Sequence, residues 1–401
     1  MVISLSIILG VLIALGTWEY LLHARSLKKV PLRIHVNGTR GKSSVTRLIA
    51  AGLRAGGIPN CAKTTGSRPR IILEDGSEHT VQRQGRANVI EQTRLFALAA
   101  KRQVRAVVVE CMALNPRLQA LSEDQLIRSS FGVITNARSD HLDVMGPTVE
   151  DVARALAGTI PTRGTLLTAE TRPELLQIFN QKAALKKSTM IPVTPASEEI
   201  TGQMMRRFGY VEHPENVALA LKVCELVGVP REKAFDGMIG GEPDVGVLRL
   251  AHLSFFAKEI DFVNAFAAND PDSTLAIWDL ILRAFPDERE RVIILHCRAD
   301  RGQRSVQLGE ILARMSRLTR VLLTGTGTRL ALEAAYQKGV PFERLIPMEQ
   351  ARAEEIFERA VAQIQRTGLV FGMGNIGQGG EQINEYFQNR AVASHGIQPG
   401  A

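Results

Sequence analysis

The sequence predicts an α/β protein of two domains that follow an N-terminal transmembrane helix. Three observations support this fold class. Short β-rich segments alternate with helical segments, a pattern typical of a mainly parallel sheet. Turn residues at 240–244 interrupt this alternation before it starts again, which indicates a domain boundary. The first 18 residues contain no charged side chain, as expected for a helix that crosses a membrane.

Composition narrows the range of partners. A chain of 401 residues suits two domains better than one core, and its formal net charge of +8 favours anionic partners. Aromatic residues make up only 5% of the chain and do not alternate with basic residues, so we expect no nucleic acid partner. Phosphorylated nucleotides, acidic metabolites and an acidic polymer remain open. The four cysteines are far apart in the sequence, which predicts free thiols.

Residues 1–22 are predicted to form a membrane anchor helix. Eighteen apolar residues rise about 27 Å as a helix, close to the hydrocarbon thickness of about 30 Å. The cations Arg25, Lys28 and Lys29 follow directly, and they favour a cytoplasmic location for the rest of the chain. Two alternatives remain open: a helix that packs on the protein or on a partner, and a secretion signal.

The first domain is expected at 30–243 and the second at 244–391, with a frayed tail at 392–401. In the first domain, strands are predicted at 32–36, 106–109 and 131–135, and helices at 43–55 and 216–227. In the second, strands are predicted at 255–261, 291–296, 320–324 and 369–371, and helices at 274–285 and 305–315. The short, continuously apolar strands indicate sheets that are buried on both faces.

A phosphate-binding loop, Gly-Thr-Arg-Gly-Lys-Ser at 38–43, lies between the first strand and the first helix. Its two glycines let backbone N–H groups approach phosphate closely, and the helix N-terminus adds partial positive charge. Lys42 can neutralise the terminal phosphates of a nucleotide, and Ser43 can ligate Mg²⁺. The loop is tighter than the usual spacing, which would need glycine at Val36. We therefore predict that the chain binds ATP with Mg²⁺.

This tight loop resembles that of the Mur ligase superfamily, which the folylpolyglutamate synthases share. Four further segments agree with the resemblance: Glu110 at the end of a strand, Thr-Asn at 135–136 followed by Asp-His-Leu-Asp at 140–143, His-Pro-Glu-Asn at 213–216, and the stretch 264–273. The resemblance implies a P-loop ATPase domain followed by a smaller Rossmann-like α/β domain. Taken alone, the carboxylate, the histidine and the asparagine have simpler interpretations, as a helix cap, a surface or core side chain and an N-cap.

The resemblance also implies roles for individual residues. ATP would be bound by Gly38, Thr39, Arg40, Gly41, Lys42, Ser43, Ser44, Asn216 and Asn269. Mg²⁺ would be held by Ser43, Glu110 and His141. Catalysis would depend on Lys42, Arg298 and Asp300, with Arg298 and Arg301 gripping a carboxylate or an acyl phosphate. The alternative for the arginine-rich segment is a solvated loop.

Two departures separate the chain from the peptidoglycan ligases. Leu156 stands where the superfamily usually has a lysine, often carbamoylated, so a second metal held through a carbamate is not expected. The anchor runs directly into the phosphate loop, without the sugar-nucleotide-binding domain of those ligases. Over its whole length the chain instead resembles the PgsB/CapB subunits of poly-γ-glutamate synthases, through the anchor and the segments 35–47, 298–305 and 371–377.

The family resemblance implies an ATP-dependent ligase that activates a glutamate carboxylate and joins glutamates through γ-amide bonds. It implies glutamate and the growing polymer as substrates, other membrane subunits and further copies of the chain as partners, and one span of the cell membrane with cytoplasmic catalytic domains. Two alternatives remain: a ligase that acts on folates, and a non-enzymatic, ATP-gated assembly platform. Gly-x-Gly-x-x-Gly at 372–377 is interpreted as a tight turn, since no acidic residue follows at the distance that NAD binding requires.

Overall fold

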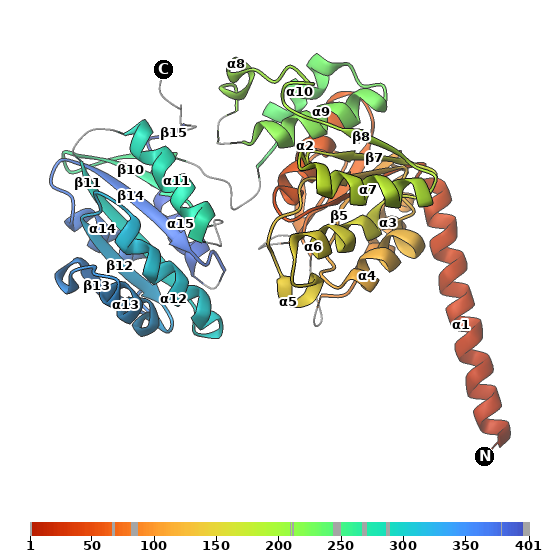
Figure 1. Cartoon of the computed structure of the whole chain (residues 1–401), viewed down its shortest axis with the longest axis horizontal. Coiled ribbons are helices and arrows are strands. Elements are labelled where there is room, and N and C mark those ends of the chain that lie inside the picture. The colour runs from red at the N-terminus through yellow and green to blue at the C-terminus, as the bar shows by residue number, and fades with distance from the viewer. Residues whose placement is uncertain are drawn as a thin grey trace. The chain divides into compact units, whose positions relative to one another are not determined.

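The computed structural model describes residues 2–65, 69–81, 87–208, 210, 212–243, 250–266, 271–285, 289–377 and 379–395. The chain divides into two compact units (Figure 1). The first contains Met1–Met205 and His213–Asp244, and the second contains Arg206–Glu212 and Val245–Ala401. Each unit is an α/β layer structure around a mainly parallel sheet, as the sequence predicts.

Helix α1 (Val2–Lys29) projects from the first unit and extends beyond the anchor expected at 1–22 (Figure 1). From Ser6 to Lys29 it is long and apolar enough to cross a membrane, and its apolar window is not buried in the protein. Its last turns pack on the first unit, where Leu27 is buried beside Phe96 of α3 (Glu91–Lys101). The helix is therefore fixed at its C-terminal end and free along its apolar part.

The first unit holds an eight-stranded sheet, counted over the described residues, in the order β4-β3-β2-β5-β1-β6-β7-β8. Strands β2, β5, β1, β6, β7 and β8 run parallel, whereas β3 and β4 form an antiparallel edge. The strands are β1 (Leu32–Asn37), β2 (Asn60–Lys63), β3 (Arg70–Ile72), β4 (Glu78–Thr80), β5 (Ala106–Glu110), β6 (Phe131–Ile134), β7 (Thr165–Thr168) and β8 (Thr189–Pro192). Val36 lies opposite Glu110 on one side and Val133 on the other, so β1, β5 and β6 end at the same edge.

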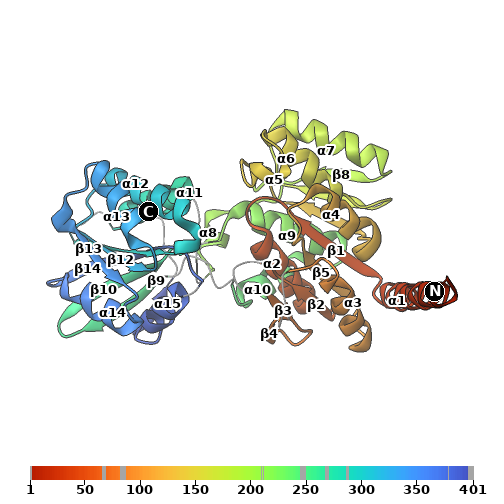
Figure 2. The ribbon, with the colours of Figure 1, turned by 90° about the horizontal axis from the view of Figure 1, so that it is seen from below.

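Helices cover this sheet, and Figure 2 views α1 nearly end-on beside β1. The phosphate loop leads into α2 (Lys42–Ala55), whose buried face packs against α9 and α10. The remaining helices of the unit are α4 (Pro116–Leu121), α5 (Leu142–Met145), α6 (Val149–Leu156), α7 (Pro173–Leu185), α8 (Gly202–Met205), α9 (Pro214–Leu226) and α10 (Arg231–Ile239). A π-helical segment η1 (Ser122–Ile127) continues α4.

The second unit holds a seven-stranded sheet, again over the described residues, in the order β13-β12-β11-β14-β10-β9-β15. Its strands are β9 (Leu250–Phe255), β10 (Lys258–Asn264), β11 (Glu290–Cys297), β12 (Arg320–Gly325), β13 (Leu345–Glu349), β14 (Thr367–Gly374) and β15 (Ala393–His395). Strands β10 to β14 are parallel, and β9 and β15 are antiparallel to their neighbours.

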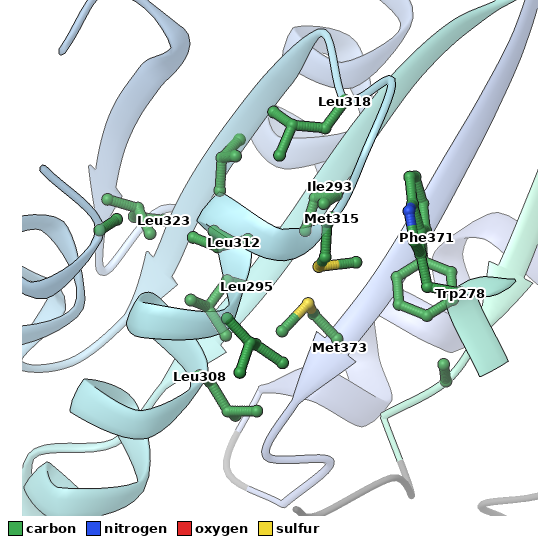
Figure 3. Packing of buried hydrophobic residues seen from close by; sticks show 14 of the residues in the cluster. Trp278, Ile293, Leu295, Leu308, Leu312, Met315, Leu318, Leu323, Phe371 and Met373 are labelled. Carbon is green, nitrogen blue, oxygen red and sulfur yellow. The ribbon is translucent and has the colours of Figure 1, made fainter. Parts of the chain in front are cut away.

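Apolar clusters lie on both faces of this second sheet. Helices α11 (Pro271–Ala284), α12 (Gly302–Ile311) and α13 (Thr328–Gln337) cover one face, where Trp278 packs edge-on against Phe371 at 5.2 Å between ring centroids (Figure 3). Helices α14 (Ala353–Ala362) and α15 (Gly380–Gln388) cover the other, where Phe262 stacks on Phe387 at 4.1 Å. This doubly wound arrangement explains why the central strands are apolar throughout.

Two predictions for the second domain are wrong. The strand expected at 255–261 is interrupted, because Phe256 and Ala257 have φ of 47° and 60° and form the two-residue turn between β9 and β10. Such turns usually carry glycine or asparagine, and Phe-Ala at 256–257 is neither, so no residue here indicates a turn. The tail expected at 392–401 is not wholly frayed, because residues 393–395 form β15 beside β9. Residues 396–401 lie outside the described part of the chain.

Candidate active site

The phosphate loop connects β1 to α2 in the first unit and can only be built with glycine at two points. Gly38 and Gly41 have φ of 133° and 84°. A Cβ atom on Gly38 would lie 2.0 Å from Thr135 Oγ1, and one on Gly41 would lie 2.5 Å from Asn216 Oδ1. The loop is therefore wedged between the end of β6 and the start of α9. This brings Asn216, expected on the adenine side, directly against the loop.

The Thr135-Asn136 pair after β6 holds the loop by hydrogen bonds. Thr39 Oγ1 donates to Asn136 Oδ1 at 2.6 Å, and the Arg40 amide donates to the same oxygen at 3.2 Å. Thr135 Oγ1 in turn donates to the Arg40 carbonyl at 2.5 Å. The loop backbone is thus fixed before any ligand arrives, which reduces the entropy that binding must remove.

Lys42 and Ser44 occupy the first turn of α2. Lys42 Nζ donates to the Gly38 carbonyl at 2.7 Å and lies 3.4 Å from the Thr39 carbonyl. The ammonium group is thereby held over the loop at the positive end of a helix, where an anion is favoured. Ser44 is half-buried beside it.

Ser43 and Glu110, which the sequence predicts as oxygen ligands, are hydrogen-bonded to each other in the structure. Ser43 Oγ donates to Glu110 Oε2 at 2.9 Å, and the Thr65 amide donates to the same oxygen at 2.6 Å. Burial raises the pKa of Glu110, while the charge of Lys42 and the hydrogen bonds from Thr65 and Ser43 act in the opposite direction. A hydroxyl and a buried carboxylate at the phosphate loop are hard oxygen donors, so these residues fit Mg²⁺.

The structure does not bring His141 into contact with this pair. His141 is 46% exposed, has φ of 48° and precedes α5. Its Nε2 lies 3.8 Å from Asp140 Oδ1. Within the described residues, no group of three or more His, Cys, Asp or Glu side chains is arranged to hold a metal. Leu156 is fully buried in an apolar cluster, and the predicted nucleotide contact Asn269 lies outside the described residues.

A second polar cluster lies in the second unit, at the carboxyl ends of β11 and β14. Arg298 forms a two-point ion pair with Asp300, with Nε–Oδ1 at 2.9 Å and Nη2–Oδ2 at 2.6 Å. Asp300 is 59% exposed, and Arg301 beside it is exposed as well. Strands β11 and β14 are neighbours in the sheet, but after β11 the chain continues to β12 on one side and after β14 to β15 on the other. Ligands of such sheets bind at the carboxyl ends of two strands where the chain diverges in this way.

The glycine-rich segment 372–377, which begins within β14, packs tightly against this cluster. A Cβ atom on Gly374 would lie 2.4 Å from the His296 carbonyl, and one on Gly377 would lie 3.4 Å from Arg298 Nη1. His296 itself is buried, with Nδ1 3.1 Å from Thr324 Oγ1, and the sequence reasoning missed it. His296 is the last residue of the strand predicted at 291–296, and this position at a carboxyl end could have identified it as a candidate site residue.

Sequence reasoning also missed a buried ion pair between β1, the strand that leads into the phosphate loop, and η1. His35 Nδ1 on β1 lies 2.8 Å from Glu123 Oε2, and both side chains are almost fully buried. Ser129 donates to the other carboxylate oxygen through its amide at 2.8 Å. Burial alone would lower the pKa of His35, but the Cys111 and Glu123 side chains outweigh it and raise the pKa to about 9. All four cysteines are buried and free, as predicted.

Comparison with known proteins places these features in a family. The family model of the Mur ligase middle domain matches residues 36–189, and that of the poly-γ-glutamate synthase CapB C-terminal domain matches residues 250–390. The PGA synthase CapB of Bacillus subtilis is 34% identical over 390 residues, which are 96% of this chain and 98% of that protein. The capsule biosynthesis protein CapB of Bacillus anthracis is also 34% identical, over 95% of this chain and 82% of that protein.

Solved structures share the fold at lower identity. Folylpolyglutamate synthase of Thermotoga maritima is 17% identical with a TM-score of 0.63, covering 93% of this chain and 94% of that one. MurF of Acinetobacter baumannii is 14% identical with a TM-score of 0.66, covering 94% and 80%. FolC of E. coli, solved in complex with DHPP and ADP, is 16% identical with a TM-score of 0.65, covering 93% of each chain. The fold is thus that of Mur ligases and folylpolyglutamate synthases, and the chain belongs to the CapB family of poly-γ-glutamate synthases.

Proposed function

We propose that this chain is an ATP-dependent amide ligase that joins glutamates through γ-amide bonds to make poly-γ-glutamate. The observation that carries the proposal is the preformed phosphate loop with Ser43 and Glu110 at its mouth, in a chain 34% identical to a PGA synthase along almost its whole length. The buried carboxylate and the lysine at the helix N-terminus are the groups that binding of a nucleoside triphosphate with a divalent cation requires.

The reaction has two steps. A glutamate carboxylate oxygen attacks the γ-phosphorus of ATP, the bond to the β-phosphate oxygen breaks, and ADP leaves. The amine of a second glutamate then attacks the acyl carbon, inorganic phosphate leaves, and the amine loses a proton to form the amide. The chain's part is to align the groups and to neutralise the charge that moves, rather than to supply a nucleophile.

The residues of the first unit would carry the nucleotide. Lys42 and the loop amides hold the β- and γ-phosphates, and Asn216 lies on the adenine side. Ser43 and Glu110 would hold Mg²⁺, which would neutralise phosphate charge. His141 remains a proposed additional ligand, and Thr39, Arg40, Ser44 and Asn269 remain proposed nucleotide contacts.

The second unit would bind the glutamate side of the reaction. Arg298 and Arg301 lie beside one another at the carboxyl edge of its sheet, and a guanidinium group binds carboxylate at two points. Asp300, which pairs with Arg298, orients that guanidinium group or the incoming amine. The proposed nucleotide-binding domain is 30–243, and the proposed second domain is 244–391.

We also propose that α1 anchors the chain in the cell membrane by a single span. The apolar part of the helix is exposed, and the cations Arg25, Lys28 and Lys29 favour a cytoplasmic location for both units. The proposed partners of the anchored chain are other membrane subunits of the synthase and further copies of this chain.

The test is ATP turnover by the full chain purified with its membrane partners. We expect ADP formation that depends on glutamate, and a polymer of glutamate as product. Lys42→Ala abolishes turnover while Lys101→Ala, an exposed lysine at the end of α3, leaves it unchanged. Folates that serve as better acceptors than glutamate would favour a folate ligase. Nucleotide binding without hydrolysis under all substrate conditions would favour an assembly platform.

A further inference from the structure

A positively charged cleft lies where α1 meets the first unit. It has a volume of about 190 Å³ and is lined by Ala24, Leu27, Lys28, Arg33 and Arg128. These residues come from the end of α1, from β1 and from the residue that follows η1. A water molecule occupies about 30 Å³ of liquid, so the cleft can admit a phosphate group. It lies near the amino end of β1, whereas the phosphate loop lies at the carboxyl end.

Arg33 lines the cleft, and its hydrogen bonds connect the other segments that line it. Its Nη1 donates to the Val30 carbonyl at 2.8 Å and to the Leu27 carbonyl at 3.2 Å, while Nε donates to the Arg128 carbonyl at 2.9 Å. Within the described part of the chain, Nη2 has no protein acceptor. One guanidinium group therefore ties α1 to η1 and keeps donors available for a ligand.

The three cations of the cleft form no ion pair within the described part of the chain, and Arg33 alone is near a buried carboxylate. Over the described residues, neither Lys28 nor Arg128 forms an ion pair. Burial lowers the pKa of Arg33, the buried Glu123 opposes this effect, and the positive charge of Arg128 adds to it. Glu123 is already bound by His35 and does not line the cleft. An anion in the cleft would relieve this repulsion.

Arg128 occupies a position that disfavours arginine. It has φ of 50°, in the left-handed region where glycine and asparagine are less strained. Its side chain is exposed rather than packed. It nevertheless contributes a cation to the cleft beside the end of α1.

The position along α1 matches the depth of lipid headgroups. The apolar, exposed part of the helix ends at Leu22, and the residues of α1 that line the cleft follow two to six residues later, about 3–9 Å further along a helix. The polar layer on each side of the hydrocarbon core is about 5–8 Å thick. If α1 spans the bilayer, the cleft opens at the level of the headgroup phosphates.

We propose that this cleft binds the phosphate of an anionic phospholipid and so fixes the orientation of the first unit on the membrane. The inference rests on the proposed membrane anchoring by α1. Lys28, Arg33 and Arg128 surround the phosphate, and the apolar face of α1 lies along the acyl chains. A cation near an anionic membrane surface strengthens binding about fivefold.

The test is native mass spectrometry of the full chain in detergent, titrated with phosphatidylglycerol or with phosphatidylcholine of the same acyl chains. The variant Lys28→Gln/Arg128→Asn removes two cations of the cleft and leaves Arg33 in place. The matched control Lys29→Gln/Arg163→Asn removes a neighbouring lysine and an exposed arginine with φ of 56°, neither of which lines the cleft.

We expect one phosphatidylglycerol molecule to bind tightly, with at least tenfold weaker binding in the cleft variant and less than threefold weakening in the control. Equal losses in both variants, or equal binding of the two lipids, would overturn the proposal. Displacement of the lipid by low-millimolar inorganic phosphate would overturn it too, because the cleft would then be a site for free phosphate. Flotation with phosphatidylcholine vesicles tests the anchor separately: a chain that floats but shows no lipid preference retains the anchor and loses only this inference.

Discussion

The buried His35–Glu123 pair predicts that the first unit loses stability as the solution becomes mildly alkaline. The folded-state pKa of His35 is about 9, above the ordinary value of 6.5. Between these values the folded protein keeps a proton that the unfolded chain releases, so the free energy of unfolding falls as pH rises. The stabilisation is complete below about pH 6.5 and is lost as the pH passes through about 9.

The size of the effect follows from the two pKa values. One pKa unit corresponds to about 1.4 kcal/mol, so the whole contribution is about 3 kcal/mol. Between pH 7 and pH 8.5 we expect a loss of about 2 kcal/mol. Above about pH 9 the buried thiols add their own loss, because burial raises the pKa of Cys61 and Cys297 to about 11. The measurement therefore belongs below pH 9.

The assay is urea unfolding of the full chain in detergent, followed by circular dichroism at several pH values between 6.5 and 8.5. His35→Gln keeps a donor for Glu123 but cannot titrate, so its free energy of unfolding should lack the slope. His79→Gln, at an exposed histidine on β4, is the control and should keep the wild-type slope. An equal slope in His35→Gln and the wild-type chain would refute the assignment of the proton to His35.

Three further predictions concern the proposed active site. Glu110→Gln keeps the size of the side chain but removes the charge, so the Mg²⁺ concentration needed for half-maximal ATP turnover should rise at least tenfold, and an unchanged requirement would exclude Glu110 as a ligand. Gly41→Ala forces a Cβ atom to within 2.5 Å of Asn216 Oδ1, so nucleotide affinity measured by calorimetry should fall at least tenfold, and an unchanged affinity would show that this loop does not bind the phosphates. Arg298→Lys keeps the charge but loses the two-point geometry, so KM for glutamate should rise about tenfold with KM for ATP unchanged, whereas an equal rise in both would place Arg298 outside the glutamate site.

The sequence was most informative where local chemistry and fold agree. Glycine at 38 and 41 followed by Lys42 is best explained as a phosphate-binding loop. The structure adds only the neighbouring residues that make each glycine necessary. It was least informative where the fold alone decides. No local signal distinguishes a strand through Phe256 from a turn at that residue, since aromatic residues favour strands. Pairing of 393–395 with β9 depends on an edge that only the folded sheet presents.

One pattern in β1 could have been interpreted from the sequence. Arg33, His35 and Asn37 alternate with Ile34 and Val36, although a central strand of a parallel sheet is usually apolar on both faces. Residues two apart point to the same face of a strand, so the three polar side chains share one face.

The partners of these three residues show what that face does. Arg33 donates to the Arg128 carbonyl, His35 pairs with Glu123, and Asn37 Nδ2 donates to Gln119 Oε1 at 2.8 Å. All three partners lie on the continuous segment formed by α4, η1 and the residue after it, so a row of polar contacts runs along β1 from the cleft to the phosphate loop. At the far end Asn37 Oδ1 accepts the Gly38 amide at 2.8 Å, which sets the first peptide of the loop.

The spacing of these partners accounts for the π-helical segment. Gln119 and Glu123 are four residues apart, but Glu123 and Arg128 are five apart, and the wider turn of η1 accommodates the difference. Side chains on one face of a strand are about 7 Å apart, whereas an α-helix rises 1.5 Å per residue. Partners on the helical segment must therefore be four to five residues apart to meet successive side chains of β1. The same strand therefore joins α1 to the loop by covalent bonds and by the polar contacts of one face.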